Sequence, residues 1–167
     1  EVQVLEVNDG YSRFGTAGPP VTVLADAGGF ENILTGVLTS THGDSAVCRV
    51  LDSNSGVAES GLELTIPGRG LHLEDRVVLG LRADDVLVTL DHPGRVSARN
   101  VFRGTVVGVH PFSSYRTLEI EADAEGGVNS RFRTHITEGA LDELGIGVGT
   151  ALYLMFKTRS VEVLAIT

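Results

Sequence analysis

Three turns in the second half of the chain carry groups that can donate hydrogen bonds to an anion. A tetrahedral oxyanion offers only acceptor oxygens, so a site for it needs hydroxyl, ammonium, guanidinium and backbone N–H donors from several directions. The candidate residues are Ser97, Ala98, Arg99 and Asn100 in the first turn, Thr137 in the second, and Lys157, Thr158 and Ser160 in the third. The spacing alone leaves open whether these turns meet in space.

Each candidate also has a simpler structural interpretation. Ser, Thr and Asn residues in front of strands are common turn formers. Thr137 is placed to cap a short helix that we expect over residues 137–145, with Gly145 at its end. Lys157 fits a solvated cation of a turn. At the level of the sequence both interpretations stay open.

The elements that must position these turns are short strands. Stretches rich in Val, Leu, Ile and Thr are separated by Gly, Pro, Asn and Asp, which is typical of strands joined by tight turns. Five strands in each half, with one short helix in the second, favour an all-β fold of two tandem OB-like five-stranded barrels. The predicted strands are 33–40, 46–51, 62–66, 76–81 and 85–90 in the first half, and 101–109, 117–122, 128–136, 151–156 and 161–166 in the second.

An internal repeat supports two similar halves. Residues 32–36 and 100–104 share one plan, which is Asn, two apolar residues, a variable residue and Gly. Later in each half, residues 79–86 match residues 154–161 in apolar spacing, in the position of a cation and in a closing Val. The chain therefore reads as two related β modules in tandem.

The charge balance argues against some classes of function. The chain has 22 acidic and 13 basic residues and a formal net charge of −9, which disfavours broad binding to nucleic acid or anionic membranes. Residues 96–167 hold 8 acids and 7 bases, whereas residues 1–95 hold 14 and 6. An anion site therefore belongs more naturally in the second half.

The sequence lacks the usual patterns of an enzyme or a metal protein. No Gly-x-x-x-x-Gly-Lys-Ser/Thr phosphate loop occurs, so we expect no ATP hydrolysis by this chain. The 5 His residues have no metal-ligand spacing, and no nucleophile–base set is identifiable. Cys48 is the single cysteine and cannot form an internal disulfide, which favours a reducing compartment. No apolar run of about 18 residues predicts a membrane span.

The second half resembles a known family. The resemblance is to the Mop (molbindin) domain, a branch of the TOBE family, and it makes residues 96–167 a molybdate-binding module of that kind. The motifs that carry it are Ser97-Ala98-Arg99-Asn100, Gly104, Ile136-Thr137, Leu141-Asp142-Glu143-Leu144-Gly145, Val148-Gly149 and Phe156-Lys157-Thr158-Arg159-Ser160-Val161.

The upstream segments resemble parts of the same group of proteins. Residues 30–34 and 80–86 look like a preceding TOBE-like segment of a molybdate-transporter ATPase, and we place this first module at residues 28–92. Residues 1–27 look like a leader from the end of an ABC-transporter ATPase domain; an irregular start of the first module is the alternative. The leader motifs are Val4-Leu5-Glu6, Asp9-Gly10, Gly18-Pro19-Pro20 and Val23-Leu24-Ala25.

Taken together, the chain resembles the C-terminal regulatory part of the ATP-binding subunit of a molybdate or tungstate importer. The resemblance implies a homodimer, with the oxyanion bound at a subunit or module interface and no nucleotide in this region. Bound anion would signal back to the transporter and slow import. The implied partners are the parent ATPase domain and the transporter membrane subunit, at the cytoplasmic face of the cell membrane. The residues carried over are Ser97, Arg99, Thr137, Lys157 and Thr158.

Two places depart from the family pattern. The family often has small residues after its Lys, as in Lys-Ala-Ser, whereas this chain has Thr158 and Arg159. The long cation at Arg159 either adds a donor or crowds the pocket. In the first module, residues 29–32 read Gly-Phe-Glu-Asn in place of Ser-Ala-Arg-Asn. The carboxylate of Glu31 repels an oxyanion, so we do not expect the first module to bind one alone.

Three alternative functions stay open. One is a purely structural module that pairs two transporter subunits and binds nothing small. Another is a free-standing cytoplasmic molybdate store, against which the ATPase-like leader at residues 1–27 speaks. The third is an OB-fold nucleic-acid binder, which the net charge of −9 and the lack of clustered aromatic residues disfavour.

Overall fold

The computed structural model describes residues 12–13, 29–51, 61–124 and 130–167. The leader predicted at residues 1–27 therefore lies outside the described residues, except for one two-residue strand. Within the described ranges no helix is long and apolar enough to cross a bilayer.

Strands make up most of the described structure and follow the predicted stretches closely. The first-half elements are β1 (Ser12–Arg13), β2 (Asn32–His42), β3 (Ser45–Val50), β4 (Glu63–Pro67), β5 (Arg76–Leu81), the 3-10 turn η1 (Ala83–Asp85) and β6 (Leu87–Thr89). The second-half elements are β7 (Asn100–Phe112), β8 (Tyr115–Ala122), β9 (Ser130–Thr137), the helix α3 (Glu138–Leu144), β10 (Ala151–Phe156), the 3-10 turn η2 (Thr158–Ser160) and β11 (Glu162–Ile166).

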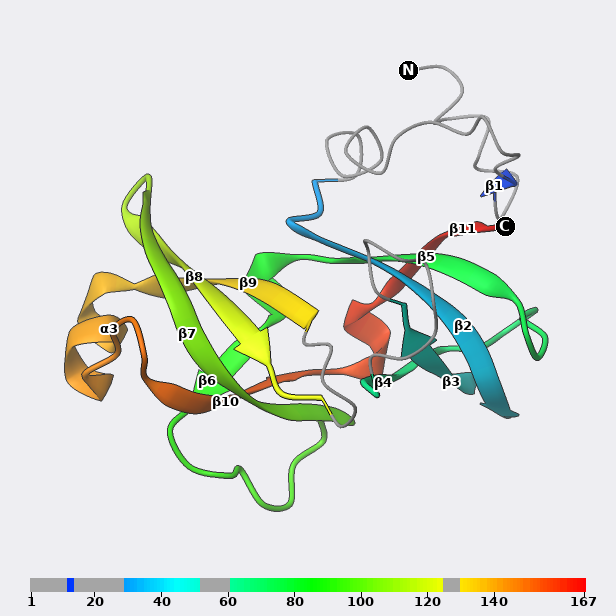
Figure 1. The fold of residues 1–167 in the computed structure, drawn as a ribbon, viewed down its shortest axis with the longest axis horizontal. Coiled ribbons are helices and arrows are strands. Elements are labelled where there is room, and N and C mark those ends of the chain that lie inside the picture. The colour runs from blue at the N-terminus through cyan, green and yellow to red at the C-terminus, as the bar shows by residue number, and fades with distance from the viewer. Residues whose placement is uncertain (1–11, 14–28, 52–60, 125–129) are drawn as a thin grey trace.

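Two curled sheets lie next to each other (Figure 1). The strand order is β1-β11-β5-β2-β3-β4 in the first sheet and β6-β10-β7-β8-β9 in the second. Strand β1 pairs in parallel with β11, and the other neighbouring strands pair antiparallel. The predicted all-β fold class, with one short α-helix in the described residues, is confirmed.

Each half of the chain gives one strand to the sheet of the other half. We expected residues 85–90 to be the fifth strand of the first barrel, and residues 161–166 to close the second barrel together with residues 151–156. Instead, β6 pairs with β10 in the second sheet, and β11 pairs with β5 in the first. The expected sheet of each of these two strands is wrong, because apolar alternation identifies the buried face of a strand but not the strand beside it.

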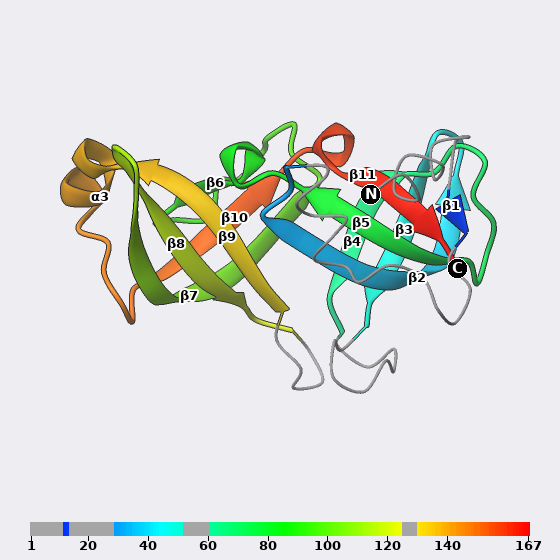
Figure 2. The same cartoon turned by 90° about the horizontal axis from the view of Figure 1, so that it is seen from above.

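The chain crosses between the sheets at two short turns. Turn η1 follows β5 and leads into β6, and turn η2 follows β10 and leads into β11. Both turns lie at the junction of the sheets, on one side of the molecule (Figure 2). Turn η1 contacts β9 of the second sheet, and η2 contacts β4 of the first. The two crossovers are therefore counterparts in an approximately twofold arrangement.

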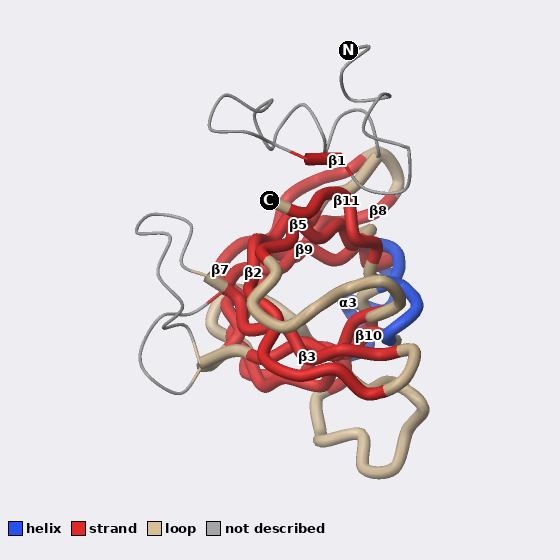
Figure 3. Tube along the Cα trace, turned by 90° about the vertical axis from the view of Figure 1, so that its right-hand side faces the viewer, coloured by secondary structure: helices blue, strands red, loops and turns tan. Residues whose placement is uncertain are grey.

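One hydrophobic core joins the two sheets. Leu64 and Leu79 of the first sheet belong to the same cluster of buried side chains as Phe132 and Leu154 of the second. Seen end-on, the strands of both sheets curl around a common axis (Figure 3). Full burial of a Leu or Phe side chain stabilises the fold by about 1.5–3 kcal/mol. The main source of stability is thus shared between the halves.

Two buried asparagines fasten the sheets to each other. The Asn32 side chain accepts from the Arg133 N–H through Oδ1 at 2.6 Å and donates through Nδ2 to the Arg133 carbonyl at 2.9 Å. Asn100 makes the same pair of hydrogen bonds with Thr65, at 2.7 and 2.9 Å. Since Arg133 and Thr65 lie on the edge strands β9 and β4, each amide takes the place of part of a neighbouring strand.

The repeated glycines allow neighbouring strands to approach closely. A Cβ at Gly36 would lie 2.9 Å from the Arg49 carbonyl oxygen, and one at Gly104 would lie 2.8 Å from that of Glu121. No side chain fits at either place unless the adjacent strand moves. The Asn and the Gly of the sequence repeat therefore both have structural roles.

Candidate anion-binding site

Two of the three predicted turns lie at the same end of the second sheet. Strands β7 and β10 run antiparallel, with Asn100 opposite Phe156. The residues just before β7 and just after β10 therefore leave neighbouring strands, about 4.8 Å apart, at one end. Arg99 and Lys157 occupy these adjacent strand ends.

The turn before β7 forms an open depression in the surface. Residues 94–99 and Val101 line it, and Ser97 and Arg99 are exposed. The Arg99 guanidinium donates a hydrogen bond through Nη2 to the Val96 carbonyl oxygen of the same turn. A guanidinium has five N–H donors, so this bond orients the side chain without using up its capacity.

The turn after β10 supplies a second group of donors. Lys157 is exposed, and Thr158 and Ser160 are half-buried. The Ser160 N–H donates to the Lys157 carbonyl at 3.0 Å, and the Val161 N–H donates to the Thr158 carbonyl at 3.2 Å. The first N–H groups of a helical turn have no partner within the turn, so the start of η2 offers backbone donors beside the hydroxyls.

Asn100 has a positioning role in this arrangement. Its side chain is 1% exposed, and both of its polar atoms bond to Thr65. Asn100 is also not among the residues that line the depression. Ala98, two positions earlier, is half-buried. The bonds to Thr65 thus fix the point from which the turn with Ser97 and Arg99 begins.

Thr137 lies at the opposite end of the second sheet. Strand β7 runs for 13 residues to Phe112, which pairs with Tyr115, and Tyr115 pairs with Thr137. At about 3.3 Å per residue the two ends of β7 are separated by roughly 40 Å along the strand. The Thr137 Oγ1 accepts a hydrogen bond from the Ala140 N–H at 3.2 Å and caps α3, at the outer end of the molecule (Figure 1). One chain therefore does not bring Thr137 to the other two turns.

The charges around the two neighbouring turns suit an anion. The depression is lined by Arg95 and Arg99 and by no carboxylate. Lys157, directly before η2, and Arg159, within it, are both exposed. Cations at a surface raise the local concentration of small anions, and they do so most strongly at low salt.

Sequence reasoning missed the paired bonds of the two asparagines. The sequence held one signal, because Asn32 and Asn100 have the same place in the repeat. The structure adds that both are buried. Burial of an amide requires a hydrogen-bond partner. The partner strand was not predictable, since Thr65 and Arg133 lie in the opposite sheet.

Two observations concern the metal-ligating and thiol side chains of the described residues. There, no group of three or more His, Cys, Asp or Glu side chains converges on one point. Cys48 is fully buried, and burial raises the pKa of its thiol to about 12. The thiol therefore stays protonated at neutral pH and is a poor nucleophile.

Comparison with family models and curated proteins shows similarity to a known domain and to two transporter proteins. Residues 96–163 match the TOBE domain. The molybdate/tungstate import ATP-binding protein WtpC of Pyrococcus abyssi is 31% identical over 135 residues, which cover 81% of this chain and 33% of the relative. The WtpC protein of Pyrococcus horikoshii is 30% identical over 162 residues, which cover 97% and 39%. The chain thus spans about a third of the length of these relatives.

A solved structure supports the fold. The chain is similar to the cytoplasmic molybdate-binding protein ModG, crystallised with molybdate bound, with a TM-score of 0.64 and 22% identity. The match covers 80% of this chain and 95% of that one. At this level of identity the likeness shows the fold, and it confirms the predicted OB-like, molbindin type of architecture.

Proposed function

We propose that the chain is an oxyanion-binding regulatory region of a molybdate or tungstate importer, and the match of residues 96–163 to the TOBE domain supports this. The observation that carries the proposal is the pairing of β7 with β10, because it brings the donors of two turns to one end of the sheet. The similarity to two import ATP-binding proteins supports the transporter setting.

The proposed ligand is a tetrahedral oxyanion held between these two turns. Ser97 and Arg99 supply a hydroxyl and a guanidinium from one side. Lys157, Thr158 and Ser160 supply an ammonium group, hydroxyls and turn N–H groups from the other. Each hydrogen bond to a charged group contributes on the order of 1.5–3 kcal/mol, and micromolar affinity corresponds to about 8 kcal/mol. Several such donors therefore reach this affinity after the cost of removing water from the anion.

A second copy of the chain completes the site in this proposal. Thr137 caps α3 at the far end of the sheet, so its predicted contact with the same anion requires the α3 end of another copy. Leu87 and Leu90 are exposed on and beside the edge strand β6 and offer apolar surface for pairing. We expect a homodimer with groups of both subunits around the anion.

In the full-length protein the site acts as a sensor of intracellular anion. Bound molybdate or tungstate slows import, which requires that the anion binds two states of the transporter with different affinities. The partners are then the parent ATPase domain and the membrane subunit, at the cytoplasmic face of the membrane. The region itself binds and regulates, and ATP hydrolysis belongs to the parent domain.

Parallel calorimetric titrations with molybdate, tungstate and sulfate test the proposal. We expect binding of molybdate or tungstate, and the order of the three affinities identifies the preferred anion. Arg99→Ala and Lys157→Ala should each weaken binding by about 10- to 100-fold, because each removes a charge-assisted hydrogen bond.

Arg103→Ala is the matched control for these variants. Arg103 lies on β7, which begins directly after Arg99, and its side chain is 62% exposed and pairs with Asp123 at 4.0 Å, so its loss removes a charge of the same sign away from the two turns. Its affinity for the anion should stay unchanged. The proposal fails if none of the three anions binds at millimolar concentration. A dimer that persists under those conditions would favour the purely structural module.

A further inference from the structure

The internal repeat places a counterpart of the proposed site in the first half of the chain. Asn32 lies opposite Leu81 in the β2–β5 pair, as Asn100 lies opposite Phe156 in the β7–β10 pair. Turn η1 follows β5 as turn η2 follows β10. The positions around η1 can therefore be compared one by one with those around η2.

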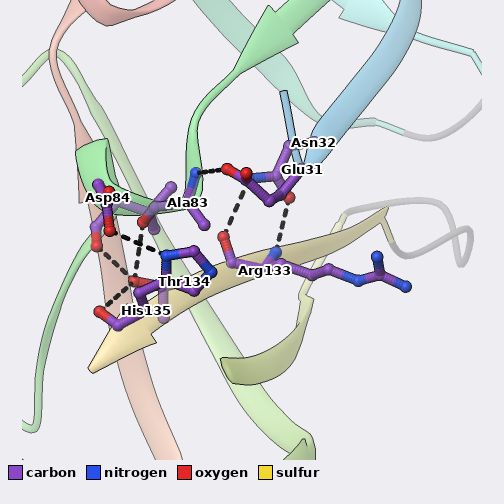
Figure 4. Close-up of polar contacts among 8 residues, drawn as sticks. Glu31, Asn32, Ala83, Asp84, Arg133, Thr134 and His135 are labelled. Carbon is purple, nitrogen blue, oxygen red and sulfur yellow. Dashed lines mark hydrogen bonds and ion pairs between the residues drawn. The ribbon is translucent and has the colours of Figure 1, made fainter. Parts of the chain in front are cut away.

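A carboxylate of the chain itself occupies this counterpart. Glu31 corresponds to Arg99, because each directly precedes the buried Asn, and Ala83 corresponds to Thr158, because each opens its 3-10 turn. The Glu31 Oε1 accepts a hydrogen bond from the Ala83 N–H at 2.7 Å across 52 positions of sequence (Figure 4). A carboxylate oxygen of the chain thus bonds to the Ala83 N–H, which corresponds to the Thr158 N–H of the proposed anion site.

The other groups of the counterpart are engaged as well. The Arg82 guanidinium lies 4.5 Å from the centre of the Phe30 ring and 3.9 Å from the Glu162 carboxylate. The Asp84 carboxylate lies 2.9 Å from Nδ1 of His135 on β9 (Figure 4). The cation of this turn therefore faces an aromatic ring and a carboxylate rather than an open depression.

The two counterparts also differ in formal charge. Three carboxylates and one guanidinium give the first a net charge of −2, whereas three cations give the second +3. The charged residues are Glu31, Arg82, Asp84 and Asp85 in the first, and Arg99, Lys157 and Arg159 in the second.

We propose that Glu31 is a built-in anionic ligand that keeps the first-half counterpart closed, so that each chain binds one oxyanion instead of two. This inference rests on the proposed function of the second-half site. The Glu31 carboxylate takes up the Ala83 N–H, and the net negative charge around it repels a free dianion. One half of the chain responds to the anion, and the other is held by an internal bond.

The stoichiometry of molybdate binding is the first test. Calorimetry should give one molybdate per wild-type chain and none for the Arg99→Ala, Lys157→Ala double variant. Two molybdates per chain, or a site that survives in the double variant, would overturn the role of Glu31. Absence of binding by the wild-type chain would instead be the failure of the proposed function.

Substitution of Glu31 in the double variant is the second test. Glu31→Ser removes the carboxylate. Molybdate should therefore raise the melting temperature of the double variant that also carries Glu31→Ser, although it leaves that of the double variant itself unchanged. Glu31→Gln keeps an acceptor oxygen for the Ala83 N–H and should stay silent. A folded Ser variant that does not respond, or a Gln variant that binds as well as the Ser variant, contradicts the proposal. If the Ser variant does not fold, the stoichiometry decides alone.

Discussion

Neighbouring residues in this protein have different tasks because their burial differs. Arg99 is exposed at the rim of an open depression, whereas the next residue, Asn100, is 1% exposed and bonds to a backbone peptide of the other sheet. Thr137 has a hydroxyl that caps a helix. Among the predicted donor residues, some thus hold the local structure in place and others face solvent.

Cys48 allows a prediction at this scale. Burial raises the pKa of its thiol from 9.0 to about 12, so the native protein holds almost no thiolate at pH 8. A disulfide reagent such as dithiobis(nitrobenzoate) should modify the thiol only as fast as the protein unfolds. Rapid modification of the native protein at pH 8 would contradict this.

The same shift of the Cys48 pKa has a consequence for stability. The unfolded thiol ionises near pH 9.0, whereas the folded one stays protonated until about pH 12. The unfolded state therefore releases protons first, and stability should fall as the pH rises from 9 towards 12. A Cys48→Ala variant should lack this part of the alkaline decline in urea denaturation.

At the scale of elements, the edge strands are held by side chains rather than by further strands. The Asn100 amide satisfies the Thr65 peptide on β4, and the Asn32 amide satisfies the Arg133 peptide on β9. Asn100 begins β7 directly after the turn with Arg99, and Asn32 begins β2 directly after Glu31. Stability and turn position are therefore linked through the same bonds.

Asn100→Ala should lower the free energy of unfolding by about 2–4 kcal/mol, because the Thr65 N–H and carbonyl both lose a partner. Urea denaturation measures the change. Thr137→Ala is the comparison, since it removes a single hydrogen bond at an exposed helix cap and should cost about 1 kcal/mol. A loss in Asn100→Ala no larger than in Thr137→Ala would show that the buried amide is not the stronger anchor.

For the whole molecule, the exchange of β6 and β11 means that neither half completes its own sheet. Buried side chains of both sheets form one cluster. Cutting the chain in the middle would leave each half without a strand and with part of its core open to water. We expect a single cooperative unfolding transition for the described structure.

Deletion of residues 161–167 tests the exchange directly. It removes β11 and leaves β5 of the first sheet without one neighbour. Amide hydrogen exchange should therefore rise first in β5, although the deletion is in the second half of the sequence. Faster exchange confined to β7 and β10 of the second sheet would contradict the pairing of β11.

Much of the local structure could be predicted from the sequence. The strands expected at 76–81 and 151–156 are β5 and β10, and the cap and end of the helix lie at Thr137 and Gly145. These features depend on local alternation, turn residues and capping, which a short window contains. The sheets to which β6 and β11 belong depend on contacts far apart in the chain, and each strand lies in the other sheet from the one expected.

For the candidate site, too, local features could be predicted from the sequence and long-range ones could not. The residue types at Ser97, Arg99 and Lys157 indicated donors for an anion, and the β7–β10 pairing brings their turns to one end. The distance of Thr137 from them and the bond between Glu31 and Ala83 both depend on the three-dimensional path of the chain. No spacing in the sequence contains that information.

The return of β11 to β5 has a consequence for how the protein is made. A ribosome releases the chain from its N-terminal side, so β5 emerges long before its partner is synthesised. Until residue 166 leaves the exit tunnel, one edge of the first sheet stays bare and able to pair with a neighbouring nascent chain. Polysomes translating this message are therefore a place where two copies can exchange their β11 strands.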